Sequence, residues 1–222
     1  MDSLILNYFI SSLFLQNCLC AVVWPTPRQT FTLEEPKPVD KYLDCEYDRY
    51  VPNVNNGKWG SGEKQRPVFE LKNGATIKRC IFSGVDGIHC LGGCTVEDCW
   101  NEDIGEDSVS LFGTDPNAKY LIQGGGAKFG DGKVIQINGA GITTVNNFYV
   151  RQYVVGVNKN YGDQATLKDI HILGTSADRA HPCKVFDGNN KGVNPSVLIS
   201  EDKSGGDGQY CKYAASDIHI NS

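Results

Sequence analysis

A short stretch of the chain gathers acidic side chains between glycines and apolar residues. It runs from residue 86 to residue 107, and its carboxylates include Asp86, Glu102, Asp103, Glu106 and Asp107. Grouped carboxylates repel one another, and hard divalent ions, calcium in particular, bind irregular cages of oxygen ligands. A solvated acidic face is the alternative interpretation. Because glycines and apolar residues fix the spacing here, we treat the stretch as a candidate cation site.

His89 lies within the same stretch and is a possible general base. It alternates with the apolar Ile88 and with Cys90. That pattern is typical of a side chain packed at the edge of a core, so we expect a hydrogen-bonded, packed histidine instead of a catalytic one.

Short strands must position these residues, because no apolar pattern of helical period persists along the chain. A similar short sequence motif, called the recurring phrase below, recurs at intervals of roughly 19 to 25 residues, as in a solenoid with loops of variable length. The recurring segments are residues 75–81, 94–100, 119–122, 143–148 and 165–170. We therefore predict an all-β chain that forms a parallel β-helix, with one repeat per coil. A β-sandwich is the alternative, but it does not require the same phrase to recur.

Composition favours a single domain for a chain of 222 residues with a formal net charge of -5. The chain is mildly acidic and has no basic stripe, which argues against nucleic acid as a partner. The first 21 residues carry a short apolar core that ends in small residues, which is typical of a cleaved secretory signal. A buried N-terminal helix is the alternative. No other segment is apolar enough to cross a bilayer, so we expect an extracellular protein without a membrane anchor.

We expect residues 22–222 to form the β-helix domain. Residues 22–65 are rich in proline and in loop residues, and we interpret them as an N-terminal cover. Residues 176–222 show a weaker repeat and are interpreted as a C-terminal cap.

The cysteine count also favours export. Of nine cysteines, Cys18 and Cys20 fall in the expected signal, which leaves an odd number in the mature chain. Three pairings are considered: a local loop closed by Cys90 and Cys94, a bond between Cys80 and Cys99 on adjacent coils, and a staple between Cys183 and Cys211. A zinc site formed by Cys90, Cys94 and Cys99 competes, but its spacing matches no common zinc motif.

Several of these phrases together resemble one family. They are Asp-Gly-Ile-His-Cys at 86–90, Gly-Cys-Thr-Val-Glu-Asp at 93–98 and Glu-Asp-Ile-Gly-Glu-Asp at 102–107, with further matches at 67–77, 124–128 and 133–138. In this order, over about residues 65 to 150, they resemble the polysaccharide lyases of family 3, the small secreted pectate lyases of microbes and plant-parasitic nematodes. The resemblance implies a right-handed parallel β-helix and a monomer that cleaves polygalacturonate by calcium-dependent β-elimination.

The resemblance also implies a site. The Ca2+ ligands map onto Asp86, Glu106 and Asp107, and the catalytic base maps onto Lys133. A cation on the substrate carboxylate stabilises the developing enediolate. A neutral amine then removes the proton next to that carboxylate, and desolvation together with a nearby cation lowers a lysine's pKa for this task.

Two departures from the family pattern concern basic residues and their neighbours. Gly132 stands where the family has an aspartate before the lysine, and Val155 and Asn158 stand where it has a substrate-binding lysine and arginine. The basic residues considered as substitutes are Lys128, Arg151 and Lys159.

The departures motivate an alternative function, a catalytically weak or inactive β-helix that still binds pectate as a wall-binding or effector protein. A polygalacturonase-like hydrolase is a third possibility. It needs clustered aspartates and a Gly-His-Gly phrase, neither of which is present.

Overall fold

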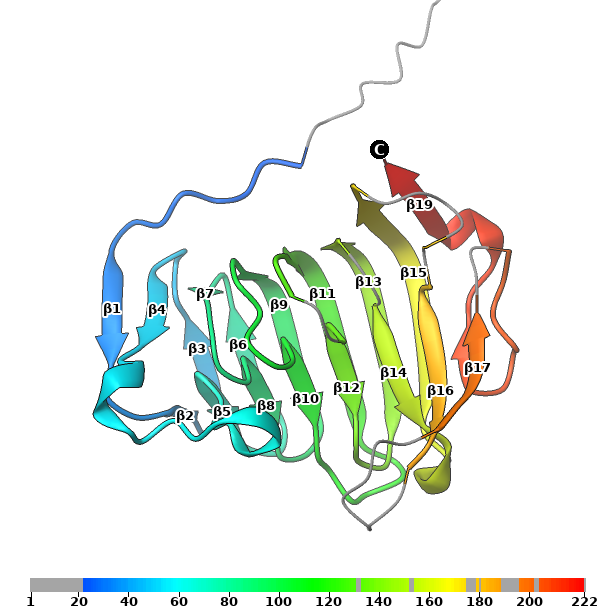
Figure 1. The fold of residues 1–222 in the computed structure, drawn as a ribbon, viewed down its shortest axis with the longest axis horizontal. Helices are drawn as coiled ribbons and strands as arrows, with labels where there is room; N and C mark the ends of the chain where they lie inside the picture. Colours follow the sequence, from blue (N-terminus) through cyan, green and yellow to red (C-terminus); the bar gives the residue numbers. More distant parts are fainter. Residues whose placement is uncertain are drawn as a thin grey trace, which may run out of the picture.

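The chain winds into a parallel β-solenoid whose coils lie side by side along one axis (Figure 1). This computed structural model describes residues 22–130, 133–151, 154–174, 179, 181–188, 196–201 and 204–221. The predicted signal, residues 1–21, lies outside this range. Among the described residues, no helix has the length and hydropathy needed to span a bilayer. The predicted all-β parallel helix is confirmed.

One face of the solenoid is an 8-stranded sheet in the described part of the chain. Its strands are parallel except for β17, which pairs antiparallel with β16 at the C-terminal end. Each coil contributes one short strand, so the sheet is a ladder of equivalent positions. The strands are β2 (Lys37–Val39), β5 (Phe69–Leu71), β8 (Ile88–Cys90), β10 (Val109–Leu111), β12 (Ile135–Ile137), β14 (Val155–Asn158), β16 (Cys183–Asp187) and β17 (Ser196–Glu201).

The remaining strands form an 11-stranded sheet that wraps the rest of the coil, again within the described residues. They are β1 (Thr30–Leu33), β3 (Tyr42–Asp44), β4 (Arg49–Pro52), β6 (Ala75–Lys78), β7 (Ile81–Phe82), β9 (Cys94–Asn101), β11 (Lys119–Ala127), β13 (Ile142–Val150), β15 (Gln164–Leu173), β18 (Cys211–Lys212) and β19 (Ile218–Asn221). Short 3-10 turns occur at η1 (Val54–Asn56), η2 (Gly62–Lys64), η3 (Lys159–Tyr161) and η4 (Ala215–Asp217).

The long strands of the second sheet turn a corner at one shared position. Asp98, Asn147 and Asp169 have φ angles of 51°, 51° and 50°, and Gly124 has a φ of 68°. Each follows directly after residues that are paired in register, so the four positions stack. Asn, Asp and Gly are the residues that tolerate this left-handed backbone best. The corner therefore recurs coil after coil because the sequence supplies such a residue each time.

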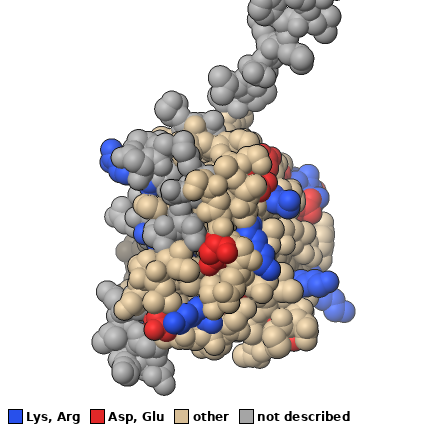
Figure 2. Space-filling view, turned by 90° about the vertical axis from the view of Figure 1, so that its right-hand side faces the viewer, with Lys and Arg blue, Asp and Glu red and all other residues tan. Residues whose placement is uncertain are grey.

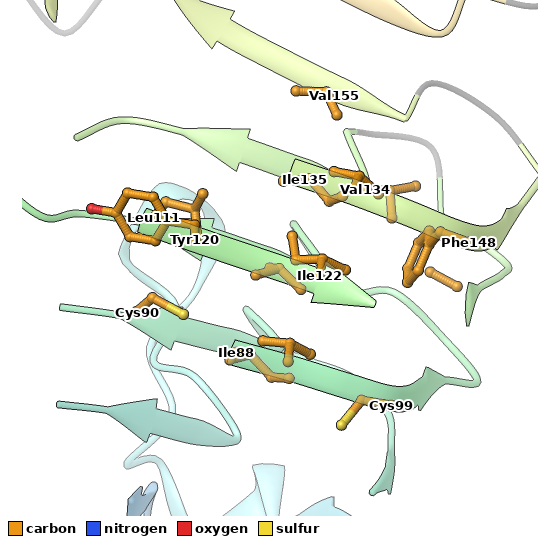
Figure 3. Close-up of a cluster of buried hydrophobic side chains, with 14 of the residues drawn as sticks. Ile88, Cys90, Cys99, Leu111, Tyr120, Ile122, Val134, Ile135, Phe148 and Val155 are labelled. Atoms are coloured by element: carbon orange, nitrogen blue, oxygen red, sulfur yellow. The ribbon is translucent and has the colours of Figure 1, made fainter. Parts of the chain in front are cut away.

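The core consists of columns of apolar side chains that run along the solenoid axis. Ile88, Val109, Ile135 and Val155 are paired in register on successive strands and are all at most 2 % exposed. Figure 3 shows Ile88, Ile135 and Val155 among the stacked side chains that fill the interior. The recurring phrase of the sequence maps onto the second sheet, with the third copy starting at Tyr120 instead of Lys119.

Two of the three considered disulfides are confirmed and one is wrong. Cys90 bonds Cys94, and Cys183 bonds Cys211. The pairing of Cys80 with Cys99 is wrong, because Cys80 bonds Cys45, which lies on the preceding coil. With Cys90 and Cys94 bonded to each other, the alternative zinc site is also excluded.

Cys99 is the one free cysteine among the described residues, and it is buried. Burial raises the pKa of its thiol to about 12, so it stays protonated and inert at neutral pH.

Charges are mixed on the surface that closes the solenoid. Figure 2 faces the C-terminal end and shows Lys and Arg side chains interspersed with Asp and Glu on the visible face. This mixture matches a chain with a formal net charge of only -5. No basic stripe of the kind that tracks a nucleic-acid backbone is visible on the described part of that face.

Asp163 gives the fold a pH-dependent stability. It is fully buried, and this burial raises its pKa to about 7 against a smaller opposing effect of the Gly141 backbone. The folded-state pKa exceeds the unfolded value of about 3.9, so folding favours the protonated carboxyl. The associated stability is fully present below about pH 4 and is lost as the pH rises toward about 7.

We therefore expect Asp163→Asn to stabilise the protein at about pH 8, by at least about 1 kcal/mol, because the amide removes a buried charge. At about pH 4 the two proteins should unfold at similar temperatures, because wild-type Asp163 is then protonated. Thermal unfolding at both pH values measures this, with the exposed Asp115→Asn as the matched control. A variant that is no more stable than wild type at the higher pH would refute the account.

Candidate active site

Three of the predicted site residues occupy the same position on successive coils. Ile88, Val109 and Ile135 are paired in register, and Asp86, Asp107 and Lys133 each lie two residues before one of them. The ladder continues beyond the strands, because Ile88 N donates to Ser108 O at 2.9 Å and Ser108 N donates to Val134 O at 3.0 Å.

Neighbouring strands lie about 4.8 Å apart. The two carboxylates and the lysine therefore form one column just before the N-terminal ends of three strands of the 8-stranded sheet. The separation in sequence between Asp86 and Lys133 is thereby converted into a distance of two coils.

The carboxylates form a compact cluster. Asp86, Glu106 and Asp107 each contribute an oxygen, and these oxygens lie within 4.8 Å of one another. Asp86 and Asp107 are only 7 % and 3 % exposed, so the cluster is partly withdrawn from water. Negative charges brought this close together are unfavourable unless a cation offsets them. The donor set of three carboxylates fits a hard divalent cation such as Ca2+.

Two glycines of the motif allow the coils to approach each other at this cluster. Gly87 has a φ of 49°, and a Cβ atom there would lie 2.2 Å from Ser108 O. A Cβ atom on Gly105 would lie 2.3 Å from Val85 O. Glu106 N donates to Val85 O at 3.0 Å, which holds the two acidic turns together. The glycines of the motif are thus required by backbone packing, and they bring Asp86 next to Asp107.

His89 orients Asp86. Its Nε2 lies 2.5 Å from Asp86 Oδ2, and the backbone N of Asp107 donates to Asp86 Oδ1 at 3.2 Å. The imidazole packs edge to face on Phe112, with ring centroids 4.8 Å apart. The expected packed, hydrogen-bonded histidine is confirmed. Such an outer partner fixes the direction in which a carboxylate presents its oxygens.

Lys133 lines a pocket at the C-terminal side of the carboxylate cluster. The pocket has a volume of about 180 Å3. Besides Lys133, its polar lining consists of the amide side chains of Gln136, Asn138 and Asn158, and its apolar wall includes Phe186. Amides hydrogen-bond hydroxyls without adding charge, and an aromatic wall suits the face of a sugar ring.

Gly156 makes room for Lys133. A Cβ atom on Gly156 would lie 2.7 Å from Lys133 Cδ and 3.1 Å from Phe186 Cε2. The aliphatic part of the lysine therefore rests on the bare backbone of β14.

If Lys133 is the base that the family resemblance implies, Gly156→Ala should displace it and lower the rate of polygalacturonate cleavage by at least about tenfold, because small misplacements of a reacting group are costly. The melting temperature and its response to calcium should change little, because Gly156 lies outside the carboxylate cluster. Initial rates and thermal unfolding of the same preparation measure the two effects. An Ala variant with the wild-type rate would show that the position of Lys133 on Gly156 is irrelevant to activity.

The other basic residues considered from the sequence lie in different surroundings. Lys128 Nζ sits 4.2 Å from the ring centroid of Trp24, and Lys128 and Arg151 flank the Phe129 ring at 5.3 Å and 5.5 Å. Lys159 Nζ lies 3.6 Å from Asp187 Oδ1. Lys128 and Arg151 are thus brought together on adjacent coils, whereas Lys159 pairs with an acidic side chain beside the pocket.

The departure at β14 has a structural explanation. Val155 is completely buried in the core column, between Ile135 and Cys183, so this position faces inward. Asn158 lines the pocket instead. The face of β14 nearest to Lys133 therefore presents Gly156 and the amide of Asn158, whereas the family resemblance implies basic side chains in this segment.

Comparisons with known proteins agree with this geometry. The family model described as pectate lyase matches residues 21–154. The chain belongs to the pectate lyase family. Pectate lyase E of Emericella nidulans is 30 % identical over 86 % of this chain and 84 % of its own length. A probable pectate lyase F of Aspergillus terreus is 33 % identical over 69 % of this chain and 76 % of its own.

Solved pectate lyase structures share the fold. PelI of Erwinia chrysanthemi, solved in complex with tetragalacturonic acid, superposes with a TM-score of 0.59 and 26 % identity over 87 % of this chain and 69 % of its own. The catalytic domain of PelI alone superposes with a TM-score of 0.57 and 24 % identity over 87 % of this chain and 98 % of its own length. This chain is a polysaccharide lyase, and the resemblance stated from its motifs is confirmed.

Sequence reasoning missed part of the pocket. Phe186 and Gly188 come from β16 and the residue after it, in a region where no motif is evident. Gln136 on β12 and Asn138 directly after it belong to the motif at 133–138, and their alternation with the buried Ile135 and Ile137 is the signal that places both on the outer face.

Proposed function

We propose that this pectate lyase is calcium-dependent, is secreted, and cleaves polygalacturonate by β-elimination. The observation that supports this most strongly is the column of Asp86, Asp107 and Lys133, in which the carboxylate cluster lies one coil from the Lys133 amine. In this proposal Asp86, Glu106 and Asp107 hold Ca2+, and Lys133 is the base.

Asp86, Glu106 and Asp107 would hold the Ca2+, and the ion would supply positive charge that favours a substrate carboxylate and the negative charge that develops there. Such a charge would let an acidic protein bind an acidic polymer. His89 keeps the Asp86 oxygens directed into the cluster, through its contact at 2.5 Å.

Lys133 Nζ takes the proton from the carbon next to the substrate carboxylate. The electron pair left on that carbon forms a double bond within the ring, and the bond from the ring to the glycosidic oxygen breaks. The departing oxygen takes up a proton from water. Lys133 must be neutral to act as the base.

The pocket amides orient the sugar during this step. Gln136, Asn138 and Asn158 line the same 180 Å3 cavity as Lys133, so hydroxyls bound by them would hold the ring against the amine. Lys128 and Arg151 are proposed to contact substrate carboxylates farther along the chain, at the Phe129 edge. Lys159 is proposed to do the same beside the pocket.

Export is the second part of the proposal. Residues 1–21 would act as a cleaved signal, and residues 22–222 as the mature domain with an N-terminal cover and a C-terminal cap. The disulfides Cys45–Cys80, Cys90–Cys94 and Cys183–Cys211 support it, because such bonds persist in oxidising compartments.

Substrate preference tests whether calcium binds the substrate through its carboxylates. With Ca2+ present, polygalacturonate should give an unsaturated, ultraviolet-absorbing product at least about tenfold faster than highly methyl-esterified pectin, because an ester cannot bind the ion as a carboxylate does. Equal rates on both polymers would contradict the proposal. Binding of polygalacturonate without any unsaturated product would favour the alternative, a wall-binding protein of low activity.

A further inference from the structure

A second group of potential metal ligands lies on the outer face of the C-terminal coils, away from the carboxylate cluster. Asp169 and His171 lie on β15, and His219 lies on β19. Asp169 Oδ1 is 3.1 Å from Nε2 of His171 and 3.1 Å from Nε2 of His219. All three ligand atoms lie within 4.8 Å of one another.

The fold holds the two imidazoles in this arrangement. His171 and His219 are paired in register on adjacent strands, and their rings stack with centroids 4.7 Å apart and planes 27° apart. Tyr149 stacks on His171 with a centroid distance of 4.5 Å and an interplanar angle of 17°. Asp169 sits at the corner of β15, with a φ of 50°. The ladder register and the corner together direct both Nε2 atoms at one carboxylate.

The ligand types select the class of ion. Two imidazole nitrogens and one carboxylate oxygen suit Zn2+, Ni2+ or Cu2+, whereas Ca2+ prefers oxygen ligands alone. In a tetrahedral site with ligands about 2.0–2.1 Å from zinc, neighbouring ligand atoms lie about 3.3 Å apart. The two observed oxygen to nitrogen distances of 3.1 Å are close to that separation.

The access to solvent also suits coordination. The side chains of Asp169, His171 and His219 are 52 %, 22 % and 40 % exposed, which leaves a path for an ion and a water ligand.

We propose that Asp169, His171 and His219 bind a divalent transition-metal ion, with Zn2+ as the reference ligand, and that the ion ties β19 to β15. Among the described residues, β19 pairs only with β15, so a single ladder holds this strand. A metal that bridges the two strands would close this end of the solenoid. The site is independent of the proposed catalytic calcium site.

Calorimetric titration of the full chain with zinc chloride tests the proposal. We compare wild type, His219→Asn and His181→Asn, since His181 is a histidine outside the cluster. Wild type and His181→Asn should bind zinc alike and melt at a higher temperature with it, whereas His219→Asn should lose at least about tenfold in affinity together with this shift. Asp107→Asn should bind zinc as wild type does, whether the calcium proposal holds or fails.

Histidine ring resonances give a readout that needs no variant. Zinc should shift the imidazole signals of His171 and His219 and leave that of His181 in place, while calcium should leave all three in place. Equal zinc affinity of wild type and His219→Asn, or unchanged His171 and His219 signals at saturating zinc, would overturn the proposal.

Discussion

Lys133→Ala is expected to remove nearly all lyase activity while calcium-dependent binding of polygalacturonate persists. In the proposed mechanism the amine takes the proton but holds no metal, so its loss should affect the chemical step and leave the carboxylate cluster intact. We expect a rate reduction of at least about 1,000-fold, or about 4 kcal/mol of transition-state stabilisation. The rate of unsaturated product formation and a binding titration with polygalacturonate measure the two properties separately.

The matched control is Lys119→Ala, which removes an exposed lysine from β11 and should keep the wild-type rate. Lys133→Arg is informative as well, because arginine keeps the charge but gives up a proton far less readily, so its rate should fall between those of alanine and wild type. A Lys133→Ala rate above about one tenth of wild type corresponds to less than about 1.4 kcal/mol, too little for the sole base.

Asp107→Asn is expected to abolish both activity and stabilisation by calcium. Asp107 is 3 % exposed and groups with Asp86 and Glu106, so the amide removes one of the negative charges that a cation would neutralise. In wild type, Ca2+ at about 100 times its dissociation constant should stabilise the fold by about 2.7 kcal/mol. The variant should show little of this increase in a thermal titration.

The same substitution outside the cluster provides the control. Asp103→Asn changes an exposed carboxylate of the same acidic run and should leave the calcium response unchanged. In calcium-free buffer, Asp107→Asn should be as stable as wild type or more so, since repulsion within the cluster is reduced. Identical calcium shifts for Asp107→Asn and wild type would place the cation elsewhere.

The family resemblance supplied the candidate site residues, and their grouping was predictable because a solenoid converts regular spacing in sequence into columns in space. The recurring phrase indicated one coil per repeat, and the strands β8, β10 and β12 then stack Asp86, Asp107 and Lys133. The motif glycines contributed too, since Gly87 and Gly105 are required by close backbone contacts between coils.

Other features depend on contacts that no local pattern encodes. The Cys45–Cys80 bond joins an early coil to its neighbour across 35 residues. The segment between the two cysteines has no regular repeat from which this pairing could be predicted. Phe186 reaches the Lys133 pocket from β16, beyond the part of the chain that resembles known motifs. Val155 faces the core because of the strand register. Matching the sequence to the family's basic positions does not show which way a side chain faces.

The calcium dependence of product formation tests the central claim most directly. Wild-type protein is stripped with chelator, its initial rate on polygalacturonate is followed by ultraviolet absorbance, and Ca2+ is then restored in excess. We predict a rate at background after chelation, full recovery with Ca2+, and no recovery for Lys133→Ala or Asp107→Asn. An undiminished rate after chelation, or recovery in either variant, would contradict the assignment of calcium and Lys133 to one catalytic column.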